Sequence, residues 1–140
     1  MYYGNSFNCG RIRTVRAVLV AISIPIFTSQ LEKSRDAVTV SNMRAAYAEA
    51  SSAMLTANGK AVAKDGNVTV AAADTDGKVE VTVEEVVAKG TADGFAGNID
   101  AELPFTHTSA ANMGKAKADG SNYTMVFAFA KDGTCTATAN

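Results

Sequence analysis

The sequence has few of the residues from which reactive or metal-binding sites are built. It contains no tryptophan, one histidine, two prolines and two cysteines. Cys9 and Cys135 lie near opposite ends of the chain, and neither belongs to a C-x-x-C pair or has a histidine beside it. A disulfide between them would have to bring the N-terminal arm onto the last strand, and we do not expect one. His107 has no evident nucleophile or metal partner, so we expect a loop or surface residue.

Other signatures of catalysis are also missing. No glycine-rich loop of the kind that cradles phosphate and no paired carboxylates stand out in the sequence. The net charge is −1, with 19% charged and 47% apolar residues, so no basic excess attracts nucleic acid. We therefore expect neither an enzyme, nor a cofactor or metal site, nor a dedicated nucleic-acid binder. The length of 140 residues fits one domain with one core.

The strongest local signal is an almost uninterrupted apolar segment from Ala17 to Phe27. Its eleven residues are fewer than the roughly 20 that span a bilayer, and on length alone they favour a buried core helix. A signal peptide is a second alternative, with the basic residues at 11, 13 and 16 as its flank, but no A-x-A site follows Phe27. The apolar residues of this segment are Ala17, Val18, Leu19, Val20, Ala21, Ile22, Ile24, Pro25, Ile26 and Phe27.

The next segment, Thr28 to Asn58, predicts a long helix. It has neither glycine nor proline, is rich in strong helix formers, and is followed by Gly59. Together with the apolar segment it predicts one helix from Ala17 to Asn58, roughly 60 Å long at 1.5 Å per residue, with a kink or loosening at Pro25. Steps of three and four place on one face Val40, Met43, Tyr47, Ala50 and Met54, which we expect to pack on the subunit's own sheet.

On the rest of that helix the spacing predicts ion pairs at i,i+3. They would join Glu32 to Arg35 and Lys33 to Asp36 on a solvated surface.

The composition after Gly59 changes to valine, threonine, alanine, glycine and aspartate and predicts strands. Alternating residues and turn dipeptides favour strands near 68–70, 79–83, 123–130 and 134–139, with 90–120 as loop. Thr82 and Glu85 fit equally well a capping box that opens a short helix closed by Gly90. The expected fold is α+β: a long N-terminal helix on a small antiparallel sheet, which forms a β-rich head over 59–140.

The segment from Ala17 to Met54 resembles the N-terminal helix of type IV pilins and pseudopilins, particularly those of Gram-positive bacteria. The resemblance rests on Ile24-Pro25-Ile26-Phe27, on the run from Leu31 to Ala37, and on Asn42, Arg44, Ala46, Tyr47 and Glu49. It implies a structural subunit that is first anchored in the cytoplasmic membrane through its apolar helix. The resemblance thereby reverses the preference for a core helix and makes the apolar residues from Ala17 to Phe27, named above, the candidate anchor and assembly residues. The subunit then packs with its own copies and with other pilins in an extracellular filament, and its head faces outward.

The N-terminal 16 residues depart from that family's pattern. The family has a basic leader, a glycine at the cleavage point, a methylated aromatic residue and a glutamate shortly after it, and no residue upstream of Ala17 fits them. Prepilin peptidase is thus a partner expected from the family whose recognition motif is missing. We expect residues 1–16 to be an aberrant or disordered segment from a shifted or wrongly started reading frame, which the coding DNA would test.

Two function classes remain from the sequence. The first is the filament subunit of a pilus or a secretion pseudopilus. The alternative is a membrane-tethered surface module for adhesion or DNA uptake, whose β head recognises a ligand while the helix serves as a tether. A basic or aromatic patch on the head would favour the second class, and the sequence has little of either.

Overall fold

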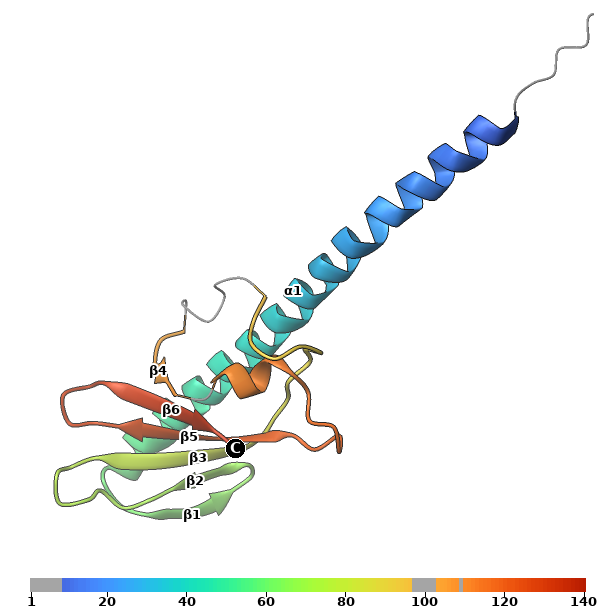
Figure 1. Ribbon diagram of the computed structural model, residues 1–140. Coiled ribbons are helices and arrows are strands. Elements are labelled where there is room, and N and C mark those ends of the chain that lie inside the picture. The colour runs from blue at the N-terminus through green and yellow to red at the C-terminus, as the bar shows by residue number, and fades with distance from the viewer. Residues whose placement is uncertain (1–8, 97–102, 109) are drawn as a thin grey trace, which may run out of the picture. The chain divides into compact units, whose positions relative to one another are not determined.

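Figure 1 shows the computed structural model, which describes residues 9–96, 103–108 and 110–140. The chain divides into two compact units, Met1–Leu31 and Glu32–Asn140. The described part of the first unit is helical, whereas the second combines helix and sheet. From here on, the head means this second unit, Glu32–Asn140. The predicted α+β fold, a long N-terminal helix and a sheet on which it packs, is confirmed.

The helix, α1, extends over Cys9–Ala57 and is assigned without a break at Pro25. It begins earlier than the predicted start at Ala17, so part of the segment expected to be aberrant or disordered is helical. The cause is visible in the sequence: between Arg11 and Arg16 no residue breaks a helix, and Gly10 costs little so close to the helix end. Residues 1–8 lie outside the described part of the chain.

The end of α1 agrees with the prediction to within one residue. Asn58 and Gly59 follow the helix with φ of 49° and 77°, and the N–H of Lys60 donates to the carbonyl of Ala57 at 3.0 Å. A left-handed residue just past the last turn is the usual way to satisfy its free carbonyls.

Six strands form one sheet in the order β1-β2-β3-β5-β6-β4. Their bounds are β1 Val62–Asp65, β2 Val68–Val70, β3 Val79–Val86, β4 Thr106–His107, β5 Tyr123–Phe129 and β6 Cys135–Ala139. All neighbours are antiparallel except β4 and β6, which are parallel. Strands β1 and β4 were not predicted, and the expected loop at 90–120 also contains a 3-10 helix, η2, at Ala110–Gly114.

The open choice at Thr82 and Glu85 is settled in favour of the strand, because β3 continues to Val86. Glu85 has φ of 63°, and the pairing register with β5 shifts between Val83 and Val86. This is a β-bulge, in which one extra residue leaves the ladder and the strand continues beyond it. The capping-box spacing is therefore coincidental.

The core lies between the Glu32–Ala57 part of α1 and one face of the sheet, which Figure 1 draws in front of this part of the helix. Strands β3, β5 and β6 alternate buried and more exposed residues, as expected for a sheet covered on one face. Tyr47 packs its ring against three phenylalanines at centroid distances of 5.4 to 6.0 Å: Phe105, Phe127 and Phe129. These aromatic contacts fix the helix on β5.

Candidate functional site

The predicted anchor residues lie in α1, but only two of them have described side chains. The backbone of 17–25 is helical, and the side chains of those residues are outside the described part. Ile26 and Phe27 are 60% and 76% exposed, and Leu31 is 45% exposed. Among the described residues, no helix combines the length and the apolar character needed to cross a bilayer.

The predicted apolar face of the helix lies against the sheet of the same chain. Val40, Met43 and Ala50 are buried, and Tyr47 and Met54 are partly buried against the same core. Since most of their surface is already used within the head, these five residues leave little surface for contact with another molecule. Any assembly surface of this part of α1 has to be on its other faces.

The opposite side of α1 carries a continuous row of exposed residues, which we call the outer row. Its members follow one another at steps of four and three, so they line one face of the helix. None is charged, and six of the seven are serine, alanine or threonine: Ser34, Val38, Ser41, Ala45, Ala48, Ser52 and Thr56. From the sequence this side of the helix was expected to be solvated, and the row was not predicted, although its spacing is visible there.

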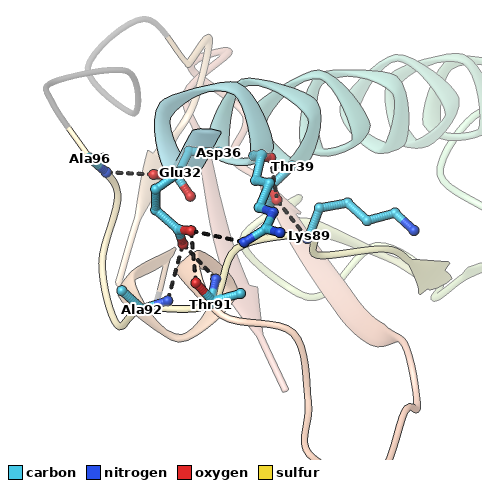
Figure 2. A network of polar contacts seen from close by, with 8 residues as sticks. Glu32, Asp36, Thr39, Lys89, Thr91, Ala92 and Ala96 are labelled. Atoms are coloured by element: carbon cyan, nitrogen blue, oxygen red, sulfur yellow. Dashed lines mark hydrogen bonds and ion pairs between the residues drawn. The ribbon is translucent and has the colours of Figure 1, made fainter. Parts of the chain in front are cut away.

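A third row of α1 binds the segment 87–96 through hydrogen bonds, as Figure 2 shows. The carboxylate of Glu32 accepts the N–H of Thr91 at 2.5 Å, the hydroxyl of Thr91 at 2.7 Å and the N–H of Ala92 at 3.1 Å. The predicted partner Arg35 contributes a longer contact of 3.5 Å. The hydrogen bonds from Thr91 favour the ionised form and lower the pKa of Glu32 from 4.5 to about 2.

One and two turns further along α1, Asp36 and Thr39 hold the same segment. Asp36 is fully buried, and its Oδ2 accepts the N–H of Ala96 at 2.6 Å, while its Oδ1 has no hydrogen-bond partner. The hydroxyl of Thr39 accepts the N–H of Lys89 at 2.9 Å. The predicted pair of Asp36 with Lys33 is therefore wrong, because Asp36 faces the interior of the head and not the solvated side of the helix.

Asn42 completes this row, since its Nδ2 donates to the carbonyl of Val87 at 2.9 Å. The row fixes a loop that has no strand neighbour over most of its length, apart from the single bridge between Thr91 and Lys115. Glycine is required where this loop meets η2. A Cβ on Gly90 would lie 1.6 Å from the carbonyl oxygen of Gly114 and 2.9 Å from Oδ1 of Asp36.

A groove of about 550 Å³ opens between the last turns of α1 and the β1–β2 edge of the sheet. Ala48, Ser52 and Thr56 of the outer row form part of its helix wall, and its other wall comes from β1 and β2. The lining is mostly apolar or small: Ala48, Ser52, Ala53, Thr56, Ala57, Val62, Val68 and Val70. The charged lining residues are Glu49 and Asp65, so the groove has an acidic rim.

The face of the sheet remote from α1 is rich in hydroxyl groups. The register places Thr69 beside Thr82 and Thr106 beside Thr136. A shallow hollow of about 350 Å³ on this face includes Thr108, Thr134, Thr136 and Thr138 in its lining, together with the paired Lys78 and Glu80. His107, which was expected in a loop or on the surface, lies in strand β4 at the sheet edge and is half-buried. Among the described residues, no cluster of metal-ligating side chains was found.

Comparison of the chain with models of protein families, with curated proteins and with solved structures gives no match.

Proposed function

We propose that this chain is a structural subunit of a filament like a type IV pilus or pseudopilus. It is anchored at the cell membrane before assembly and located at the cell surface afterwards. In this proposal α1 is the assembly element, which packs against α1 of other copies, and the sheet of the head faces outward. The chain acts by association and carries out no reaction.

The outer row is the observation that carries this proposal. The water-exposed face of an amphipathic helix normally carries charged and polar residues, which keep it solvated. Seven exposed, uncharged positions in succession along the helix give another helix a smooth surface to approach. Small side chains allow two helix backbones to come close and gain contacts along their whole length.

The exposed apolar residues of the first unit add a second support. Ile26, Phe27 and Leu31 leave a large part of their surface in water, and each would contribute on the order of 1 to 2 kcal/mol if a partner buried it. Lipid can cover these side chains before assembly, and neighbouring helices can cover them afterwards.

The experiment is self-association of the purified full chain with one bulky charge placed in the outer row. We expect the unmodified chain to form oligomers or filaments, detected by light scattering and electron microscopy. Ala45→Arg should shift it toward the monomer, because a long charged side chain in the outer row keeps a second helix from approaching closely and would have to be desolvated on packing. The matched control is Ala72→Arg, on an exposed loop of the head. Unchanged melting temperatures of both variants would show that the head remains folded, and equal association of both would overturn the proposal.

A second candidate, a tethered surface-binding module, rests on the hydroxyl-rich sheet face. The hollow of about 350 Å³ on this face is lined along one edge by Thr134, Thr136 and Thr138. Their hydroxyl groups would bind a polar, uncharged ligand such as a glycan. Replacement of Thr136 by arginine separates the two functions. It should leave association through α1 intact and remove adhesion to glycan-coated surfaces, if the head binds such a ligand.

A further inference from the structure

The groove between α1 and the β1–β2 edge is suited to bind a helix. One wall is a helix surface of small residues, and the other is the inner face of a sheet edge. Strand β1 is the last strand on this side of the described sheet, and all four of its residues are exposed. No described element of the head extends the sheet beyond β1, so the groove stays open on this side.

The chain itself contains a segment with the chemistry that this groove requires. The groove walls are mostly apolar or small, and the residues from Ala17 to Phe27, interrupted only by Ser23, form the longest mainly apolar stretch in the sequence, with Ile26 and Phe27 largely exposed. Glu49 and Asp65 make the rim acidic, and the same run is preceded by Arg11, Arg13 and Arg16. An occupant that is both apolar and flanked by cations matches an apolar groove with an acidic rim.

We infer that the groove of one copy receives the apolar helix segment of a second copy, with Ile26 and Phe27 against the small residues of the groove. This inference rests on the proposed function, because it names the head surface that accepts a neighbour during assembly. The outer row and the groove share Ala48, Ser52 and Thr56, so one copy entering the groove also covers the end of the outer row.

Such a contact joins two different surfaces, the helix segment of one copy and the groove of the next. Each added copy brings a new free groove and a new free helix segment. A heterologous contact of this kind yields a ring when the rotation closes and an open helical filament when it does not. The groove thereby gives the assembly a direction, which packing of outer rows against each other would not give.

The test is a photo-crosslink from Phe27. A benzophenone side chain replaces Phe27 in the full chain, which is mixed with unmodified chain labelled with nitrogen-15, irradiated and digested with trypsin. We expect crosslinks to labelled peptides 45–60 and 65–78, and within the first of them to residues 48–57. Isotope labelling separates contacts between copies from contacts within one copy.

A charge reversal tests the acidic rim in the same mixture, read on the crosslink to labelled peptide 45–60, whose trypsin sites neither substitution alters. Asp65→Lys in the labelled chain should lower the yield of this crosslink by about threefold, as expected for the loss of one exposed charge pair. The matched control is Asp76→Lys in the exposed turn before β3, which should leave the yield unchanged.

Three results would overturn the inference. Crosslinks that fall on labelled residues 36–44 or on the hydroxyl-rich sheet face would show that copies associate without the groove, and the proposed filament function would stand. Equal yields with Asp65→Lys and Asp76→Lys would show that the acidic rim does not attract the basic flank of the apolar segment, and the argument for this segment as the occupant of the groove would fail. A chain that stays monomeric and gives no labelled crosslink at any concentration would remove both the groove contact and the proposed function.

Discussion

Replacement of Asp36 by asparagine should stabilise the head. Asp36 is fully buried, its Oδ2 accepts the N–H of Ala96 at 2.6 Å, and its Oδ1 lies in the interior without a donor. An asparagine of the same shape keeps an oxygen for Ala96 and places an amide N–H₂ where Oδ1 was. An acceptor for this amide is nearby: Oδ1 of Asp36 and the carbonyl oxygen of Gly114 both lie close to the position that a Cβ on Gly90 would take.

The expected gain follows from the cost of the unpaired atom. A buried polar group without a partner costs about 1 to 3 kcal/mol, and more when it is charged. Removing that cost should raise the free energy of unfolding by at least about 1 kcal/mol. For a domain of this size the melting temperature would rise by about 4 °C or more. Asp36→Ala, in contrast, leaves the N–H of Ala96 without its acceptor and opens a small cavity, so it should lower stability by about 1 to 3 kcal/mol.

The assay is denaturant unfolding of the three chains, followed by circular dichroism at neutral pH. The reasoning requires the order asparagine, aspartate, alanine from most to least stable. If asparagine and alanine destabilise the head to the same extent, then Oδ1 is engaged in the folded protein, and the interpretation of Asp36 as an unpaired group is wrong.

Three further predictions concern other parts of the head. The pKa of Glu32 is lowered to about 2 in the folded state, so its contribution to the free energy of unfolding is complete above pH 4.5 and is lost as the pH falls toward 2. Glu32→Gln should therefore reduce the loss of stability in acid, measured by unfolding at a series of pH values between 7 and 2. Gly90→Ala should destabilise the head by about 3 kcal/mol or more in thermal unfolding, because the new Cβ would clash with the Gly114 carbonyl. The control is Gly66→Ala, whose Cβ would have no atom within 4 Å, so it should cost only the roughly 1 to 2 kcal/mol of a left-handed backbone at alanine. Burial raises the pKa of the Cys135 thiol to about 11, so at pH 8 it should react with a disulfide reagent only after unfolding; rapid reaction of this thiol in the native head would contradict its buried position.

The elements with regular local patterns were the ones that sequence could predict. Alternation identifies β3, β5 and β6, and Gly59 marks the end of α1. Strand β1 was missed because all its residues are exposed, so it has no alternation to detect. Strand β4 is two residues long and parallel to β6, and its pairing arises only when the rest of the sheet is in place.

The candidate sites divide in the same way. The buried row of α1 and the outer row are both periodic, and each is visible in the sequence once both faces of the helix are considered. The bonds from Glu32 and Asp36 to the segment 87–96 join residues about 60 positions apart. Local spacing predicts only the basic partners on the same helix, Arg35 for Glu32 and Lys33 for Asp36. The N–H donors of the segment 87–96 are brought to these carboxylates by the tertiary fold, so local spacing could not predict them.

The three rows of α1 make separable demands on the same helix. Residues such as Met43 and Ala50 hold the sheet, and the row from Glu32 to Asn42 holds the segment 87–96, so the stability of the head depends on two rows. The outer row contributes little to either task, because its side chains are exposed. A substitution there should therefore change association without changing the unfolding of the head, whereas a substitution in the other two rows should change both. That separation distinguishes a helix face that serves assembly from one that is merely solvated.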